Sequence, residues 1–554
     1  MKPWFALSLL LCPLAQAQET RAPRLIVQLA IDQMIPEQFD RLESVLTGGL
    51  ARIRKQGARI DGAHLPYAGT ETGPGHATMA TGCLPLHHGI VANGMRRSGS
   101  AETVYCVADP EARPVTMKGL GEPGGMSPKN LLRPSLGDYL KEHNPASIVA
   151  SVSGKDRSAI CLAGHHGDLA LWWNPSGEGF QSCDTYVKEL PAFVQEFNRG
   201  WAAGFAGQTW TPLFAADAAP PGTAADDREG EGSYPGDNRT FPHQALIPGE
   251  KEFTGELLTL LARQAEFGPQ GDKLVLELAG LAVQNLNLGA DDVTDLLGVS
   301  LSGVDKIGHI FGPYSVEVTD AILRLDRDLA VLFALLDERV GKDRWALALT
   351  ADHGVLPLPE SAEAKKLAPG AHRISAEEYR DLQKVLDRAL GDAFGRDAKQ
   401  RALRCHFFEG DLYFLDKELA ERKIDVHEAR RVAAAALKEV PWIVAAYTRD
   451  EVAGTEKGDP FLEAFRLSYR PDFSPDVLVV RQPGTLLAMT IGTTHGTPHP
   501  YDQRIPLYFL GPRFAPGNHA GPAGSHDIVP TLLDLVGLHP KGLDGRVLSQ
   551  VFRP

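Results

Sequence analysis

Three apolar runs in this chain each lead into an aspartate, and this pattern limits the possible fold more than any other feature. The runs cover 25–31, 297–301 and 345–349, and the aspartates that follow them are Asp32, Asp305 and Asp352. Short continuous apolar runs of this kind are typical of buried strands. In an open α/β sheet, side chains just beyond the carboxyl ends of the strands form the functional site. The three aspartates are therefore expected to lie together.

Helical patterns alternate with these strands and complete the fold prediction. Residues 320–340 carry one apolar helical stripe, made of Ile322, Leu325, Leu329, Leu332, Phe333 and Leu336. Similar alternation of strand and helix patterns recurs near 24–100, 130–165, 252–360 and 475–552. Such alternation predicts an α/β fold with a mainly parallel central sheet and helices on both faces.

Histidines accompany the aspartates at spacings that suit metal binding. His309 lies one helical turn beyond Asp305, and His353 directly follows Asp352. His495 lies in the small-residue loop 492–496. Carboxylate and imidazole together suit zinc. Each of these residues alone is commonly structural or solvated, so the prediction of two adjacent metal ions depends on the joint pattern. Two such ions indicate an in-line displacement at phosphorus or sulfur.

The order of these motifs resembles the alkaline phosphatase superfamily, which includes type I phosphodiesterases and nucleotide pyrophosphatases, arylsulfatases and cofactor-independent phosphoglycerate mutases. The matching segments are Ile31-Asp32, Thr72-Gly-Pro-Gly-His76, Asp305-Lys-Ile-Gly-His309, Asp352-His-Gly354 and Thr493-Thr-His-Gly496. The resemblance implies an alkaline-phosphatase-like fold and two zinc ions (Zn²⁺) per chain. It implies that one ion is held by Asp305, His309 and His495, and the other by Asp32, Asp352, His353 and the Thr72 oxygen.

The nucleophile is expected at Thr72. Thr70 and Thr72 are both candidates by residue type, and the resemblance selects Thr72 because it precedes the Gly-Pro-Gly-His turn. Metal coordination lowers the pKa of such a hydroxyl and makes it a better nucleophile. A helix predicted to start near Gly75 would favour an anion at its N-terminus. Asn93 matches a family asparagine that contacts a phosphoryl oxygen.

Lys155 and Arg157 distinguish between substrate classes. They are two residues apart, so on an extended segment both would face the same side. A monoester dianion needs positive partners beyond the metals, and arginine and lysine supply them. A Lys-x-Arg pair after an apolar strand resembles the PafA-type (phosphate-irrepressible) alkaline phosphatases. We therefore expect hydrolysis of phosphate monoesters through a covalent phosphothreonine at Thr72.

Other activities of the same superfamily are alternatives. A phosphodiesterase or phosphonate monoester hydrolase is the main one, and Lys155 and Arg157 disfavour it. A sulfatase would need a modified Cys or Ser nucleophile, and a mutase would need Ser. A non-catalytic zinc-binding protein with this fold is a further alternative, disfavoured because all seven predicted metal positions are intact. His76, His499 and His526 are interpreted as structural.

Residues 1–17 read as a signal peptide with an Ala-x-Ala cleavage site, so we expect a periplasmic or secreted protein. The net charge is −14 and no basic run occurs, which disfavours binding of nucleic acid. No second hydrophobic span follows, so no stable membrane anchor is expected. The expected partners are small-molecule phosphate monoesters, and a monomer is favoured.

The mature chain, 18–554, is expected to form a single catalytic domain with two interruptions. A cap or loop insertion is predicted at about 204–250, and an α+β insertion at about 370–470, which could shape access of the leaving group. Five cysteines remain after the signal peptide, an odd number. At least one thiol is therefore free or bonded to another molecule. Cys161 and Cys183 are a candidate disulfide pair because they flank the same short segment, but the sequence does not determine the pairing.

Overall fold

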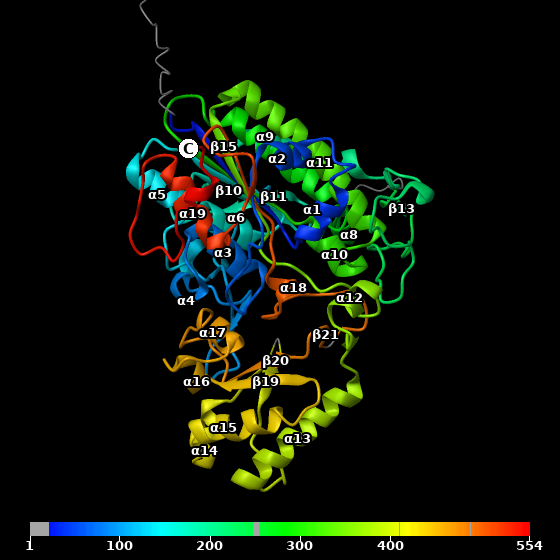
Figure 1. The fold of residues 1–554 in the computed structure, drawn as a ribbon, viewed down its shortest axis with the longest axis vertical. Helices are drawn as coiled ribbons and strands as arrows, with labels where there is room; N and C mark the ends of the chain where they lie inside the picture. Colours follow the sequence, from blue (N-terminus) through cyan, green and yellow to red (C-terminus); the bar gives the residue numbers. More distant parts are fainter. Residues whose placement is uncertain (1–20, 248–253, 409, 488) are drawn as a thin grey trace, which may run out of the picture.

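A computed structural model describes residues 21–554 apart from 248–253, 409 and 488, so the predicted signal peptide lies outside the described residues. Its main feature is an 11-stranded sheet with the strand order β23-β2-β22-β15-β1-β14-β9-β10-β11-β6-β7 (Figure 1). Among the described residues, no helix is both long enough and apolar enough to cross a membrane.

The five central strands of this sheet are all parallel. They are β15 (Trp345–Thr350), β1 (Leu25–Ile31), β14 (Asp295–Leu301), β9 (Val149–Ser153) and β10 (Leu169–Asn174). Antiparallel strands flank them on both sides, among them β22 (Leu507–Leu510) and β11 (Gly179–Cys183). The central strands are almost entirely buried, as parallel strands covered on both faces must be.

Helices cover both faces of the sheet. One layer contains α9 (Pro269–Asn285), α11 (Val316–Leu336) and α2 (Gly49–Gln56), and the other contains α3 (Thr72–Thr81), α6 (Asp156–Ala163) and α19 (Ile528–Asp534) (Figure 1). All six residues of the predicted apolar stripe on α11 are buried. The predicted α/β fold class is therefore confirmed.

The register of the central strands aligns their carboxyl ends. On β1, Ile31 lies opposite Leu301 of β14, and Ala30 lies opposite Thr350 of β15. On the next strand along, Ser153 of β9 lies opposite Ser300 of β14. Four neighbouring strands therefore end at one level, and the residues that follow them meet above the same edge of the sheet.

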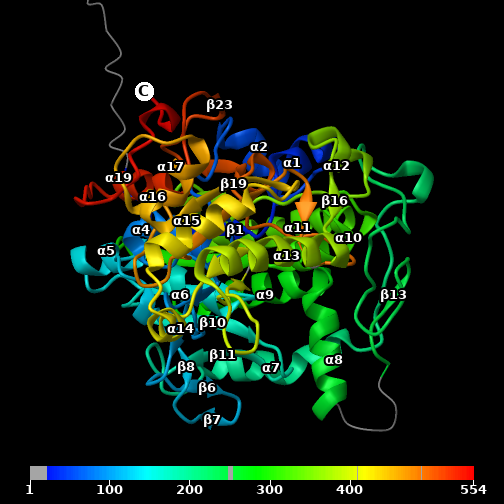
Figure 2. The ribbon, with the colours of Figure 1, turned by 90° about the horizontal axis from the view of Figure 1, so that it is seen from below.

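A smaller lobe is formed by the chain between β15 and β22. Its four-stranded sheet has the order β17-β18-β20-β19, with bounds β17 (His406–Phe408), β18 (Asp411–Tyr413), β20 (Val477–Arg481) and β19 (Ile443–Thr448). Helices α13 (Ala376–Phe394) and α15 (Val426–Leu437) pack on it around a hydrophobic core separate from the main one. Figure 2 shows this lobe lying across the end of the main sheet. The assignment of domain boundaries stays a prediction.

The candidate disulfide between Cys161 and Cys183 is not formed. All five cysteines among the described residues are free, including Cys161 on α6 and Cys183 at the end of β11. Both thiols lie close to Tyr186, whose buried hydroxyl donates to the Gly164 carbonyl. Both cysteines flank the same segment and both lie in the core, but their sulfur atoms are not bonded to each other.

One buried carboxylate ties the two helices of the outer layer together. Asp326 on α11 is buried, and its oxygens accept hydrogen bonds from the backbone amides at the start of α2, those of Thr47, Gly48, Leu50 and Ala51. These bonds satisfy amides that a helix N-terminus otherwise leaves unpaired. A negative charge is also favourable at that end of a helix.

We expect Asp326→Ala to lower the free energy of unfolding by about 3 kcal/mol, because charged hydrogen bonds are lost and buried amides are left unpaired. Urea denaturation measures this change. Asp381→Ala, in an exposed ion pair with Lys384 on α13, is the matched control and should change it by less than about 0.5 kcal/mol. Equal effects of the two substitutions would contradict the assignment.

Candidate active site

The aligned strand ends bring the predicted site residues together. Asp32 directly follows β1, and Asp352 lies two residues beyond the end of β15. Asp305 lies in the first turn of α10 (Gly303–Phe311), which follows β14, and Lys155 lies two residues after β9. All four side chains are buried. The chain therefore concentrates three carboxylates and one ammonium group at one edge of the sheet.

The three side chains predicted to hold the first metal ion, those of Asp305, His309 and His495, lie close together. His309 Nε2 lies 3.1 Å from Asp305 Oδ1, one helical turn away as predicted, and His495 Nε2 lies 3.9 Å from the same oxygen. Both imidazoles donate from Nδ1 to a backbone carbonyl, His309 to Thr493 and His495 to Thr70, each at 2.7 Å. This bonding turns each Nε2 toward the carboxylate, the orientation that histidine has in metal sites of proteins. His309 Nε2 itself donates to Asp305 Oδ1, and this carboxylate raises the pKa of His309.

The second group has donor atoms that lack partners. His353 donates from Nδ1 to its neighbour, the Gly354 carbonyl, at 3.0 Å, and its Nε2 lies 3.3 Å from Asp352 Oδ2. Both of these atoms are buried and have no hydrogen-bond partner among the described residues. Buried polar atoms without partners are costly unless a ligand satisfies them. The His353 ring also stacks on His495, with centroids 3.4 Å apart, which joins the two groups.

His76 lies beside the second group as well, and could complete it with Asp32 and Asp352. Its Nε2 is 3.0 Å from Ser300 Oγ, and its Nδ1 is 3.0 Å from the Thr72 carbonyl. Both ring nitrogens therefore already have partners, in contrast to His353 Nε2. The geometry favours His353 as the ligand and His76 as a support for helix α3.

The electrostatic environment suits metal binding. Burial raises the pKa of Asp305, but Lys155 and His309 outweigh it and the pKa lies well below its usual value. Burial lowers the pKa of His353 to about 4, and it holds the pKa of His495 well below its usual value. These two imidazoles are therefore neutral and Asp305 is ionised, which are the protonation states that bind metal ions. Burial and the neighbouring Asp32 raise the pKa of Asp352 to about 7, so this carboxyl needs a cation to be ionised.

Thr72 is the first residue of α3, and two cations reach its hydroxyl. Lys155 Nζ lies 3.4 Å and Arg157 Nη2 lies 3.2 Å from Thr72 Oγ1. Lys155 also contacts Asp305 Oδ2 at 2.6 Å and Asp32 Oδ2 at 2.9 Å. The prediction that Lys155 and Arg157 share an extended segment is wrong, because only Lys155 is extended and Arg157 lies in the first turn of α6. Their long side chains converge on Thr72 nevertheless.

Helix α3 begins at Thr72, three residues earlier than predicted, and its start fixes Asn93. The Gly73 amide donates to Asn93 Oδ1 at 2.7 Å, so this amide is not available to a substrate, contrary to the expected anion cradle. The backbone N–H of Asn93 donates in turn to Glu71 Oε2. Asn93 also lines the cavity of the site. A Cβ at Gly75 would lie 2.2 Å from the Asp352 carbonyl oxygen, so only glycine allows this approach.

Two residues of the site escaped the sequence analysis. Gln33 is buried and has a left-handed φ of 64°. Its backbone N–H donates to Asp352 Oδ1 at 3.0 Å, and its side-chain Nε2 donates to Asp305 Oδ1 at 2.7 Å. Gln33 therefore contacts one carboxylate of each predicted metal site. A strained non-glycine backbone of this kind is found at functional sites. Its position directly after Asp32 was the only signal in the sequence.

Tyr105 is the other missed residue. It ends β4 (Thr103–Tyr105), and its hydroxyl accepts from Arg157 Nη1 at 3.1 Å and donates to Asp156 Oδ1 at 2.5 Å. The tyrosine thus holds one arm of the guanidinium while the other arm reaches Thr72. No motif in the sequence marks this role.

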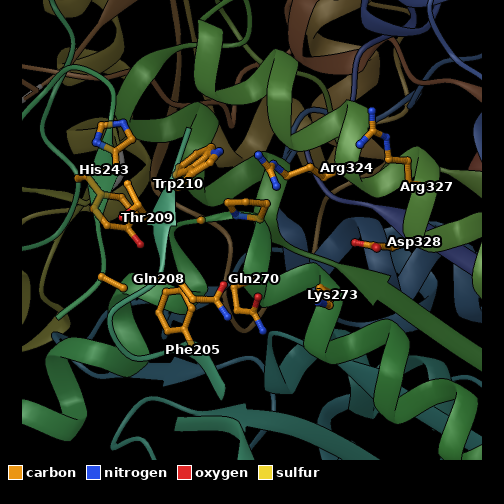
Figure 3. Close-up of a pocket in the computed structure, with 14 residues that line it drawn as sticks. Phe205, Gln208, Thr209, Trp210, His243, Gln270, Lys273, Arg324, Arg327 and Asp328 are labelled. Atoms are coloured by element: carbon orange, nitrogen blue, oxygen red, sulfur yellow. The ribbon is translucent and has the colours of Figure 1, made fainter. Parts of the chain in front are cut away.

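The site opens into a cavity of about 480 Å³ that both lobes line. A second cavity, of about 210 Å³, lies between Trp210 and helices α9 and α11, and Figure 3 shows Lys273 and Arg324 beside it. None of the predicted site residues lines this second cavity. Arg324 is already bound to the buried Asp320 at 2.6 Å, and Trp210 Nε1 donates to the same carboxylate. The cavity of the two lobes is therefore the candidate active site.

Comparison with known proteins agrees with this assignment. A family model described as type I phosphodiesterase / nucleotide pyrophosphatase matches residues 26–502. Alkaline phosphatase PafA of Elizabethkingia meningoseptica is 32% identical over 562 residues, which cover 99% of each chain. Alkaline phosphatase PhoV of Synechococcus elongatus is 30% identical over 568 residues, covering 99% of this chain and 98% of PhoV.

The fold agrees as well. A crystal structure of wild-type alkaline phosphatase PafA superposes with a TM-score of 0.82 at 29% identity, covering 96% of this chain and 99% of that one. The match spans both lobes because it covers nearly the whole length of each protein. The chain therefore belongs to the type I phosphodiesterase / nucleotide pyrophosphatase family of phosphoric ester hydrolases, in the branch of the PafA-type alkaline phosphatases.

Proposed function

We propose that this protein is an exported two-zinc alkaline phosphatase that hydrolyses small-molecule phosphate monoesters through a phosphothreonine at Thr72. One observation carries the proposal: Lys155 Nζ and Arg157 Nη2 both lie within 3.4 Å of Thr72 Oγ1. That oxygen is the atom to which a phosphoryl group would be attached. Relatives named alkaline phosphatase support the reaction class.

Charge distinguishes a monoester from a diester at this position. A bound monoester dianion presents non-bridging oxygens that carry negative charge, and two cations beside the nucleophile match it. A diester carries a second organic group and one charge fewer, so the two cations beside Thr72 would match it less well. The monoester dianion makes more charged hydrogen bonds to Lys155 and Arg157 and is therefore favoured.

The residues fit two metal ions. Asp305, His309 and His495 would hold one, and Asp32, Asp352 and His353 would hold the other together with Thr72. The partnerless Asp352 Oδ2 and His353 Nε2, and the three imidazoles fixed through Nδ1, support this assignment. When bound, such ions lower the pKa of the nucleophile and stabilise the charge on the leaving oxygen.

The side chains of the site have separate tasks in this proposal. Thr72 Oγ1 loses its proton to solvent and attacks phosphorus from the start of α3. The bond between phosphorus and the leaving oxygen breaks, and the alcohol departs after taking a proton from water. Lys155, Arg157 and Asn93 hold the phosphoryl oxygens, with Arg157 positioned by the Tyr105 hydroxyl. Water then attacks the phosphothreonine and releases phosphate. Positioning and preorganised charge would supply most of the catalysis.

Exchanging the cation pair tests the monoester assignment. We expect Lys155→Ala/Arg157→Ala to lower kcat/KM for para-nitrophenyl phosphate at least about a hundredfold, because two charged hydrogen bonds to the phosphoryl group are lost. Hydrolysis of bis-para-nitrophenyl phosphate should fall much less. Steady-state kinetics at alkaline pH measure both values.

Lys384→Ala/Arg388→Ala is the matched control, since it removes the same charges from exposed positions on α13. It should leave both substrates unaffected. A wild-type preference for the diester, or an equal loss for both substrates in the double variant of the site, would place the chain among the phosphodiesterases or phosphonate monoester hydrolases instead.

The covalent intermediate is tested at Thr72. We expect acid quenching during turnover to trap a phosphoryl group on the peptide that contains Thr72, detectable by mass spectrometry. Thr72→Ala should abolish turnover because no nucleophile remains, whereas Thr72→Ser should retain a hydroxyl and measurable activity. Thr70→Ala is the control: its hydroxyl donates to the Thr497 carbonyl and should not be phosphorylated. Label on any other residue would refute the assignment.

Metal content tests the cofactor assignment. We expect two zinc ions per chain by elemental analysis, and we expect chelation to abolish activity and lower the melting temperature, because metal binding neutralises the clustered carboxylates and stabilises the folded state. Gln33→Ala should weaken metal affinity at least about tenfold by freeing Asp305 and Asp352. Gln38→Ala, a buried glutamine bonded to the Pro313 carbonyl, should not. One ion per chain, or an unchanged melting temperature, would count against the proposal.

A further inference from the structure

The cavity above Thr72 has more room than a phosphoryl group needs. It measures about 480 Å³, within the range of pockets that hold whole organic ligands. The main lobe contributes Thr72, Asn93 and Arg157 to its lining. The smaller lobe contributes Tyr379, Phe407 and Arg481. The part of a monoester that leaves as an alcohol or phenol must therefore lie against the smaller lobe.

The smaller lobe offers an aromatic surface there. Tyr379 lies in the first turn of α13, and Phe407 lies on β17. Their rings pack edge to face, with centroids 6.3 Å apart and an angle of 68° between the planes. Both side chains are only partly buried and line the cavity. Such rings bind planar aromatic groups favourably.

Arg481, at the end of β20, adds a positive charge to the same wall. Within the part of the chain that the structure describes, its guanidinium makes no ion pair or hydrogen bond, although its backbone carbonyl accepts from His499 Nε2 at 2.8 Å. Arg430 of the same lobe is paired, in contrast: its Nε lies 2.9 Å from Asp476 Oδ1.

Two acidic groups that interact electrostatically with Arg481 have other hydrogen-bond partners. Asp411 accepts a hydrogen bond from the Val479 amide at 2.8 Å, and Asp502 accepts from the Thr497 hydroxyl at 2.6 Å. Both carboxyls interact with Arg481 only at a distance, and burial raises the pKa of each to about 7. The guanidinium is therefore available to a carboxylate or phosphate group in the cavity, which it can bind through two parallel hydrogen bonds.

We propose that Tyr379, Phe407 and Arg481 form a leaving-group subsite for aromatic groups that carry a second anionic substituent. The substrate class is then a phosphate monoester whose leaving group is an aromatic ring bearing a carboxylate or a further phosphate. This inference rests on the proposed monoesterase function, and it adds the specificity that the main lobe does not provide.

A pair of synthetic monoesters tests the subsite. The probes are 4-carboxyphenyl phosphate and the neutral 4-carbamoylphenyl phosphate, with ethyl phosphate as a substrate that has no ring. We expect Arg481→Gln to lower the ratio of kcat/KM for the carboxylate over the amide about tenfold relative to wild type, the size of a partly exposed charged hydrogen bond. Intrinsic reactivities cancel in this comparison of ratios.

Further variants separate a subsite from a structural effect. Arg481→Lys should keep part of the preference because it keeps the charge. Tyr379→Ala and Phe407→Ala should each reduce kcat/KM for both aryl esters relative to ethyl phosphate. Arg380→Gln is the matched control, since Arg380 is exposed beside Tyr379 and does not line the cavity. It should leave all ratios unchanged.

The outcomes distinguish the two proposals. If wild type hydrolyses no monoester, the proposed function fails and the subsite fails with it. If wild type hydrolyses all three esters but Arg481→Gln keeps the wild-type ratio, the subsite is refuted and the phosphatase assignment stands. A melting temperature of each variant near that of wild type shows that the fold is intact, and Arg481→Ala repeats the test if Arg481→Gln does not fold.

Discussion

The structure depends on the burial of three carboxylates beyond the ends of neighbouring parallel strands. Asp32, Asp305 and Asp352 are all fully or almost fully removed from water, where unmatched negative charge is very costly. Lys155 bridges Asp32 and Asp305, and the proposed metal ions would match the remaining charge. The register of four strands makes this cluster unavoidable, because each strand ends at the same level. The fold and the site therefore depend on the same feature: the strand register that packs the core also brings the proposed metal ligands together.

The sequence revealed the parts of this construction that depend on local pattern. Strand β1 has the predicted bounds, and His309 lies one helical turn from Asp305, because strand and helix periodicity fix these relations within a few residues. Gln33 and Tyr105 were missed because their roles arise from a left-handed backbone and from partners more than fifty residues away. The pairing of Cys161 and Cys183 could not be determined for a similar reason, since proximity in sequence does not determine where two side chains point in a core.

The walls of the cavity explain why specificity is harder to predict than reaction class. The proposed chemistry lies at the edge of the main sheet, where all the proposed ligands except His495, which lies in a loop, follow a strand or lie on a helix packed against one. The opposite wall comes from three unconnected elements of the smaller lobe, α13, β17 and β20, which contribute Tyr379, Phe407 and Arg481. None of these residues belongs to a motif, and only folding brings them to one surface. Substitutions in the smaller lobe can change the residues that line the cavity without affecting the proposed metal ligands.

The start of α6 shows how strongly function has shaped this site. Lys155 is the N-cap residue and Arg157 lies in the first turn, so two cations occupy the positive end of a helix, where each is unfavourable by about 0.3–1 kcal/mol. Asp156 between them and the Tyr105 hydroxyl offset part of this cost. Helix formation alone would favour acidic or small polar residues at these positions. A local preference overridden in this way is expected where binding requires it, and the group that both cations reach is the Thr72 hydroxyl. The two cations therefore make α6 less stable than acidic or small polar residues would. In return they place positive charge where, in the proposed reaction, a phosphoryl dianion would become bonded to Thr72.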